Sequence, residues 1–250
     1  MKRANLSLIV CFFLLLFVFP DSFALNINLN EYYPLNIADY WLYKKKVVED
    51  KGVMELTEKV AVEEDDSLEG QALKTLKYTW LNNSDEMLEY IGVDEEGVKI
   101  YKTKEGDSVT FYNPAALLFP STILEKKCSM NLKTEEYLIV DGKTKEGEPE
   151  DYGDEKWNIE YEGRENITVP AGEFIDCIKL KVSFYGEYQE KGRINATMII
   201  WFAKGVGKVK QLSEFVVDSK EAIFEVFNEE YELAYAKIGE NFYGKNLEEF

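Results

Sequence analysis

The chain has 250 residues, contains no histidine and carries a formal net charge of −18 at neutral pH. A surface this acidic repels phosphate backbones, so nucleic acid is not an expected partner. The absence of histidine excludes Ser-His-Asp and Cys-His catalysis and zinc sites with histidine ligands. Aromatic residues make up 14 % of the chain, which provides apolar material for a folded core.

The N-terminus has the three parts of a secretory signal peptide. Lys2 and Arg3 precede an apolar run from Leu6 to Val18, and small residues follow as far as Ala24. We therefore predict a signal peptide over residues 1–24, with cleavage after Ala24 and export to the periplasm or the extracellular space. The run is shorter than the roughly 20 residues that span a bilayer, and no later run is longer, so no transmembrane segment is expected after cleavage. Cys11 lies inside the apolar run of the signal peptide and follows Val10, which disfavours its interpretation as the lipid-attachment cysteine of a lipoprotein.

The first half of residues 25–250 reads as short strands separated by turns. Trp41, Tyr43 and Val47 alternate on one face of the first segment, and Gly, Asn and Asp punctuate the segments that follow. The expected strands cover residues 38–48, 53–63, 73–81, 86–93, 98–104 and 107–112.

Residues 113–120, "NPAALLFP", are expected to behave differently. Pro114 and Pro120 bound an apolar stretch, and proline is rare in central strands. We expect an apolar connection here, which covers the cavity as a lid if the interior is hollow. The segment "NPAALLFPSTILEKK" (113–127) is the one with room for a turn of helix.

The second half contains the longest expected strands. The segment 141–155 is polar and should be an exposed loop, and strands are expected at 156–169 and 173–188. Pro170 and Gly172 mark the turn between these two strands, because proline presets φ and glycine accepts a positive φ. Alternation from Phe174 places Ile175 and Cys177 on the face opposite Ile178, Leu180, Val182 and Phe184. Further strands are expected at 192–203, 204–217, 221–227 and 231–238.

This pattern predicts an all-β fold. The expected architecture is one domain, residues 25–250, built as a large twisted antiparallel sheet or an open half-barrel, with a β-sandwich as the alternative.

Three stretches resemble motifs of a known family: "YYPLNIADYWLYK" (32–44), "ITVPAGEFIDCIKLKV" (167–182) and "WFAKGVGKVK" (201–210). They are similar to a family of secreted prokaryotic proteins of unknown function, the group labelled TapB-like. The resemblance implies a curved half-barrel like that of the periplasmic lipoprotein carriers, and its motifs are structural rather than catalytic. Asp39 departs from the glycine usual in the first motif, and Cys128 lies near a position that commonly holds an aromatic residue.

The two cysteines that remain after cleavage are Cys128 and Cys177. An even number in an oxidising compartment is compatible with a disulfide. The alternative is two separate buried thiols that pack as small apolar groups. Catalysis by Cys177 is not expected, because the chain offers no histidine to act as its base.

The aromatic residues are the main candidates for a binding site. Burial of one strand face accounts for only about half of them, so they form either an ordinary core or the wall of an apolar cavity. The cavity interpretation predicts an apolar ligand, a lipid or an acyl chain. Its expected lining is Trp41, Tyr43, Trp80, Leu117, Leu118, Phe119, Trp157 and Trp201.

No cofactor and no metal site are predicted. The acidic stretches 63–66 and 151–155 lack the spacing of a calcium loop. We expect a non-enzymatic exported protein that binds an apolar ligand in the cell envelope. The alternatives are a module that pairs with an envelope protein and a hydrolase that uses two carboxylates. The high content of Glu and Lys also hints at a thermophilic source.

Overall fold

The computed structural model describes residues 25–26, 28–68, 71–81, 85–123, 128–140, 143–144, 148–219 and 224–245. The predicted signal peptide, residues 1–24, lies outside this part of the chain. The described helix α2 (Leu29–Tyr32) has four residues, and no described helix is long and apolar enough to cross a membrane.

Strands dominate the described residues, as the alternation predicts. In chain order they are β1 (Leu25–Asn26), β2 (Tyr40–Glu49), β3 (Gly52–Leu68), β4 (Gln71–Trp80), β5 (Glu86–Val93), β6 (Gly97–Glu105), β7 (Ser108–Pro120), β8 (Thr122–Ile123), β9 (Cys128–Val140), β10 (Lys143–Thr144), β11 (Asp151–Val169), β12 (Gly172–Tyr188), β13 (Gly192–Ala203), β14 (Gly207–Asp218), β15 (Phe224–Ile238) and β16 (Asn241–Gly244).

The large sheet closes on itself. Neighbouring strands run from β9 through β11–β15 to β2–β7, and β7 pairs again with β9, which gives a closed ring of 12 antiparallel strands in the described chain. The all-β antiparallel prediction is confirmed at this level. The expectation of an open half-barrel is corrected, because hydrogen bonds between Ser108–Asn113 and Lys133–Leu138 join its two edges.

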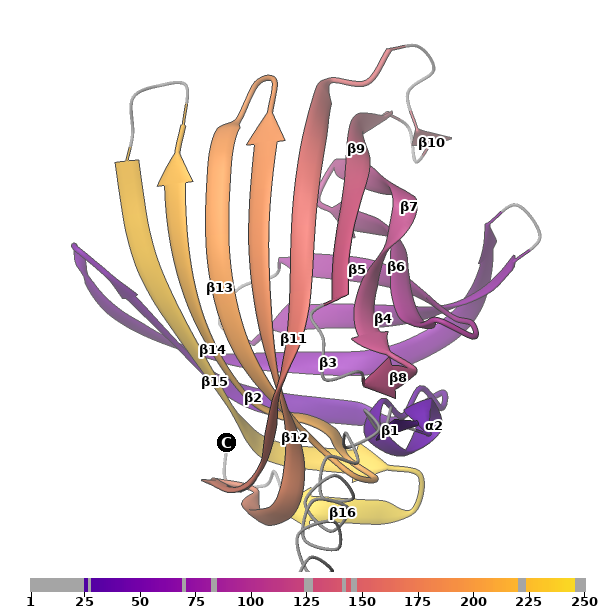
Figure 1. Ribbon diagram of the computed structural model, residues 1–250, viewed down its shortest axis with the longest axis vertical. Coiled ribbons are helices and arrows are strands. Elements are labelled where there is room, and N and C mark those ends of the chain that lie inside the picture. The colour runs from indigo at the N-terminus through magenta and orange to yellow at the C-terminus, as the bar shows by residue number, and fades with distance from the viewer. Residues whose placement is uncertain are drawn as a thin grey trace, which may run out of the picture.

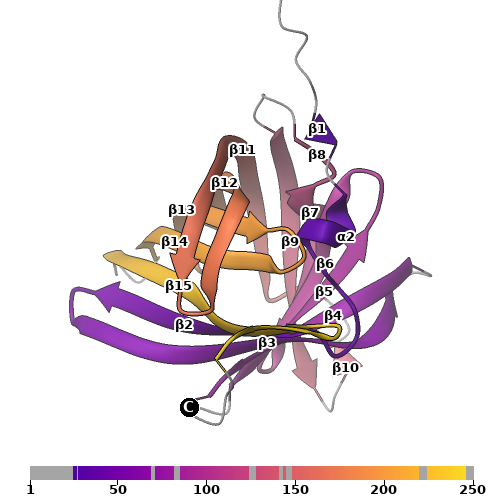
Figure 2. The ribbon, with the colours of Figure 1, turned by 90° about the horizontal axis from the view of Figure 1, so that it is seen from below.

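The ring consists of two groups of strands that cross. Strands β11–β15 rise side by side in Figure 1, and β2–β5 run across behind them. Figure 2 shows the same two groups from below, with α2 beside β6 and β7. Because each group turns its inner face toward the other, the inward side chains of both groups meet in one interior.

The proline-bounded stretch 113–120 is part of β7 rather than a lid or a helical connection. Pro114 fits because the ladder is interrupted there: the register with β6 jumps from Phe111 to Ala116, and pairing with β9 ends at Asn113. Pro114 therefore lies where no ladder hydrogen bond needs its missing N–H. Pro120 is the last residue of β7, opposite Gly97.

The turn after Val169 joins β11 and β12 as predicted. Val169 pairs with Gly172, whose φ is +137°. The predicted alternation fails a few residues later, because Asp176 has a φ of +59° beside a register shift between Glu165 and Ile167. This bulge leaves Ile175 72 % exposed while Cys177 is fully buried, so the two residues do not share a face.

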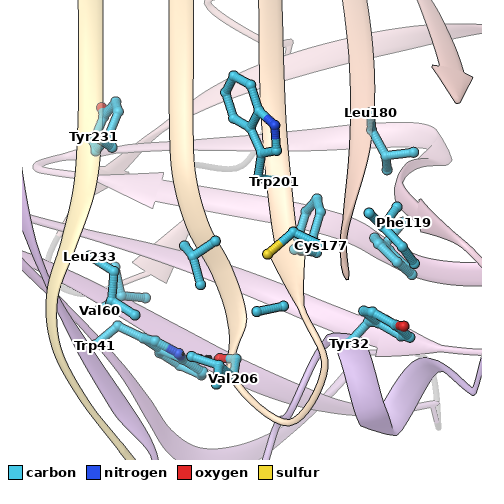
Figure 3. Packing of buried hydrophobic residues seen from close by; sticks show 14 of the residues in the cluster. Tyr32, Trp41, Val60, Phe119, Cys177, Leu180, Trp201, Val206, Tyr231 and Leu233 are labelled. Carbon is cyan, nitrogen blue, oxygen red and sulfur yellow. Dashed lines mark hydrogen bonds between the residues drawn. The ribbon is translucent and has the colours of Figure 1, made fainter. Parts of the chain in front are cut away.

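The buried core lies where the two strand groups come closest, at the end of the ring near α2. Phe119 of β7 and Phe202 of β13 make an edge-to-face contact at 4.7 Å between ring centroids. Figure 3 shows Trp41, Val206, Phe119 and Leu180 around this region. The packed core ends partway along the ring, and a cavity begins above it.

Candidate functional site

The interior of the ring contains a cavity of about 380 Å³. Strands β2–β7 and β11–β15 all contribute side chains to its wall, together with Tyr33 and Pro34. A volume in this range suits a small ligand, and such sites are lined mostly by apolar and aromatic groups with a few polar ones.

Most of the side chains predicted for a cavity wall do line it, and two do not. Phe119 is fully buried in the core, against Phe202. Trp201 is also buried, and its indole N–H donates to Glu165 on β11. The predicted residues that line the cavity are Trp41, Tyr43, Trp80, Leu117, Leu118 and Trp157. That any of them binds a ligand remains a prediction.

The alternation of β2 explains why it supplies both core and wall. Trp41, Tyr43 and Lys45 share the inward face, and Trp41 and Tyr43 are 5 % and 2 % exposed. Trp41 fixes this face in place, since its Nε1 donates to the carbonyl oxygen of Val206 at 2.6 Å.

The cavity wall also carries charged groups that the sequence analysis did not single out: Lys45, Glu58, Glu89 and Lys208. A buried charge requires a partner or a function, because its transfer from water is costly. The two-residue alternation along each strand could have indicated two of these groups. Lys45 alternates with Trp41 and Tyr43, and Glu58 alternates with Val60, whereas Lys208 and Glu89 could be located only through the fold.

Lys45 is already paired inside the wall. Its Nζ lies 2.7 Å from Glu229 Oε1, and both side chains are 12 % exposed. The hydroxyl of Tyr231 donates to the other oxygen of Glu229 at 3.0 Å. This pair is therefore close to electrically neutral.

Lys208 has neutral contacts instead. Its Nζ donates to Gln211 Oε1 at 3.1 Å and lies 4.9 Å from the ring centroids of both Tyr43 and Tyr231. Burial lowers the pKa of this ammonium, while Glu58 and Glu89 oppose that shift electrostatically. Ring faces attract a cation, but they leave hydrogen-bonding capacity of the ammonium for another group.

The two glutamates face the same space from β3 and β5. Burial raises the pKa of Glu89, which accepts a hydrogen bond from the Tyr78 hydroxyl at 2.6 Å. Burial also raises the pKa of Glu58, against the opposing effects of Lys208 and Lys45. Both carboxyl groups therefore hold a proton to higher pH than an exposed glutamate does.

Of the two alternatives for Cys128 and Cys177, the disulfide is not formed. Both thiols are free, Cys128 exposed on β9 and Cys177 buried on β12. Strand β11 separates them: Cys128 is opposite Ile159, whereas Cys177 is opposite Glu165. Burial raises the pKa of Cys177 to about 11, which makes it a packing residue rather than a nucleophile.

Among the described residues, no group of three or more His, Cys, Asp or Glu side chains is placed to hold a metal ion.

Fold and cavity together define a class: a closed antiparallel β-barrel with an aromatic interior and an internal charged cluster. Residues 117–214, from β7 into β14, match a family model described as DUF3108-like. The match spans less than half of the chain, and a comparison with curated proteins gives no match.

Two solved structures are similar in outline. A candidate lipoprotein from Parabacteroides distasonis is 15 % identical, with 81 % of this chain and 98 % of that chain covered and a TM-score of 0.41. A candidate exported protein with a YmcC-like fold from Bacteroides fragilis is 13 % identical, with 83 % and 99 % covered and a TM-score of 0.36. Scores of this size say nothing about the role of the cavity.

Proposed function

We propose that this protein is an exported, non-enzymatic carrier or receptor that holds an amphiphile, a hydrocarbon chain with a polar head, inside its barrel. The observation that carries the proposal is the cavity of about 380 Å³, whose wall combines Trp41, Trp80 and Trp157 with the charged cluster around Lys208. The signal-peptide pattern of residues 1–24 supports export to the cell envelope, and so does the motif resemblance to the TapB-like group of secreted proteins.

The polar head would meet Lys208. Of the two lysines in the wall, Lys45 is occupied by Glu229, whereas the described contacts of Lys208 are neutral. A head with acceptor oxygens, such as a carboxylate, would receive hydrogen bonds from this ammonium. The raised pKa values of Glu58 and Glu89 reduce the repulsion that such a head meets, because a protonated carboxyl group is neutral and can donate.

The test is direct. Protein purified from its native host would be extracted with solvent and the extract analysed by mass spectrometry, and recombinant protein would be titrated with cis-parinaric acid. Stoichiometric lipid and saturable fluorescence are expected. An empty extract together with an absence of saturable binding would refute the proposal.

A carboxylate-dependent hydrolase is the second candidate, because Glu58 and Glu89 face one cavity with raised pKa values. The mostly apolar wall favours the binding protein. A broad screen of glycosides and esters would separate them: turnover that disappears in both Glu58→Gln and Glu89→Gln would establish the enzyme.

The remaining alternative is an envelope module that pairs with a partner through a strand edge. Closure of the ring occupies the edges of β7 and β9 over Ser108–Asn113 and Lys133–Leu138, which weakens this alternative. Cross-linking in cells would support it if one protein were captured at stoichiometric yield.

A further inference from the structure

The seam that closes the barrel is paired along only part of its length. Beyond the pair of Asn113 with Lys133, β7 continues to Pro120 with β6 as its neighbour, and residues Cys128–Leu132 of β9 pair with β11. The two strands therefore diverge below Asn113, and their facing edges do not pair with each other there.

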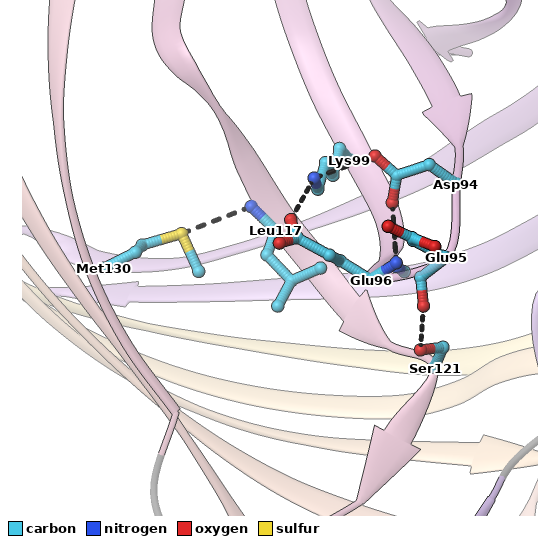
Figure 4. A network of polar contacts seen from close by, with 8 residues as sticks. Asp94, Glu95, Glu96, Lys99, Leu117, Ser121 and Met130 are labelled. Atoms are coloured by element: carbon cyan, nitrogen blue, oxygen red, sulfur yellow. Dashed lines mark hydrogen bonds and ion pairs between the residues drawn. The ribbon is translucent and has the colours of Figure 1, made fainter.

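A second cavity of about 560 Å³ lies at this divergence. Its inner wall is apolar, with Ile159 and Leu180 only 3 % and 1 % exposed, and Met130 contributes from β9. Its rim is polar. In Figure 4 the turn between β5 and β6 places Glu96 and Lys99 in an ion pair beside the apolar groups. An apolar interior with a charged rim suits a hydrocarbon rather than a polar ligand.

Leu117 borders both cavities. It is 8 % exposed, and its backbone N–H donates to Met130 Sδ at 3.3 Å, across the divergence, instead of to a strand carbonyl. Thioether sulfur is a weak acceptor, and methionine is among the most adaptable side chains in protein interiors. The side chain that the two cavities share is thus a leucine held at its backbone by a soft contact.

We propose that the two cavities are compartments of one ligand site joined past Leu117, and that the ligand is a long hydrocarbon chain whose far end occupies the compartment between β7 and β9. This inference rests on the proposed function, since it assigns the chain length of the amphiphile. Leu117 is then a specificity-determining residue: its side chain sets how far a chain reaches from the main cavity.

The first experiment compares octanoate with stearate as competitors of cis-parinaric acid in the wild type, Leu117→Ala and Leu117→Phe. Each buried methylene contributes roughly fourfold to affinity. Leu117→Phe should therefore lower the affinity for stearate by about tenfold or more and change the affinity for octanoate by less than about twofold. Leu117→Ala should keep or raise the affinity for stearate. Leu73→Ala is the matched control, because Leu73 is 1 % exposed on β4 and borders neither cavity.

The second experiment uses the natural thiol Cys128, which is exposed and lines the second compartment. Stearate should slow alkylation of Cys128 by N-ethylmaleimide at least about fivefold, and octanoate should not, because only the longer chain reaches this compartment. This measurement needs no variant and so does not depend on whether a substitution folds.

The outcomes separate the two proposals. Equal effects of Leu117→Phe on both fatty acids, or Cys128 alkylation that stearate leaves unchanged while it binds, would overturn the two-compartment site and leave the binding function intact. Failure of the wild type to bind either fatty acid would overturn the binding function and the inference with it.

Discussion

Trp41 and Val206 are 165 residues apart in the chain and share a hydrogen bond of 2.6 Å between the indole Nε1 and the backbone carbonyl oxygen. Two residues further along each strand, the Tyr43 hydroxyl donates to the carbonyl oxygen of Lys208 at 2.8 Å. These bonds dock the first sequence motif, residues 32–44, against the third, residues 201–210. Trp41, Tyr43 and Lys208 also line the cavity, so the same contacts hold part of its wall.

Trp41→Phe should destabilise the protein by about 1–3 kcal/mol, because it leaves the buried carbonyl oxygen of Val206 without a donor. The change is measured as the free energy of unfolding in urea. Trp201→Phe is the control, since Trp201 donates to Glu165, whose side chain is 43 % exposed and can bind water instead. An equal loss in both variants would show that the indole hydrogen bond of Trp41 is not the stabilising contact.

Glu58→Gln should reduce the loss of folding stability that accompanies a rise in pH. Burial raises the pKa of Glu58 in the folded state, so the folded protein binds more protons than the unfolded chain between the two pKa values. Stability is then greatest in acid and declines as pH rises above the usual pKa of a glutamate, until the raised pKa of the folded state is passed. The melting temperature of the variant should exceed that of the wild type by a few degrees at the alkaline end and match it at the acid end.

Glu86→Gln provides the control for that prediction. Glu86 lies on the same sheet, is exposed, and its pKa is lowered by its hydrogen bond with Lys77. A lowered pKa contributes stability that is lost only as pH falls, so this variant should leave the alkaline decline unchanged. If stability declined with rising pH at the same slope in the wild type and in Glu58→Gln, the prediction that the buried Glu58 carboxylate destabilises the fold would be contradicted.

Lys208→Met should distinguish the contribution of the ligand's polar head to affinity from that of its hydrocarbon chain. The variant keeps the volume of the side chain and removes the ammonium, so the affinity for laurate should fall about tenfold while that for lauryl alcohol stays within about twofold. Lys210→Met is the matched control, because Lys210 lies on the same strand but pairs with Glu230 and Glu232 at 2.9 and 2.8 Å. Equal losses for the acid and the alcohol would contradict recognition of the head by Lys208.

Thiol labelling of protein that begins at Leu25 should distinguish Cys128 from Cys177. Cys128 is exposed, whereas Cys177 is buried with a pKa of about 11, so iodoacetamide should add one group to the native protein at neutral pH and two after denaturation. Intact-mass spectrometry measures both. A purified protein that takes up label only after reduction would contain the disulfide and contradict the structure.

Several features of the fold were predictable because they depend on neighbours in the chain. Alternation located most strands, and Pro170 with Gly172 located the turn between β11 and β12. Alternation also put Trp41 and Tyr43 on the inward face of β2. Local patterns fail where a single residue shifts the phase of the alternation. The bulge at Asp176 does this, and it separates Ile175 and Cys177, which alternation had placed on one face.

The partners of each strand depend on contacts between residues far apart in the chain. Two prolines suggested that residues 113–120 would leave the sheet, but Pro114 lies where the ladder of β7 is interrupted and Pro120 is the last residue of the strand. The first half of β7 closes the barrel against β9. For the same reason Trp201 and Trp80 could not be told apart as core and wall from strand parity alone.

The sequence by itself determined the antiparallel β class, the acidic surface, the export pattern and the supply of aromatic side chains for an interior, because each follows from composition or from a period of two along the chain. Tertiary structure alone decided that the sheet closes, that Lys208, Glu58 and Glu89 meet inside it, and that the seam diverges beside Leu117. These depend on strand pairings such as that of β2 with β15, more than a hundred residues apart, and that of β7 with β9, 20 to 30 residues apart. In both, packing and hydrogen bonding rather than local preference select the partner.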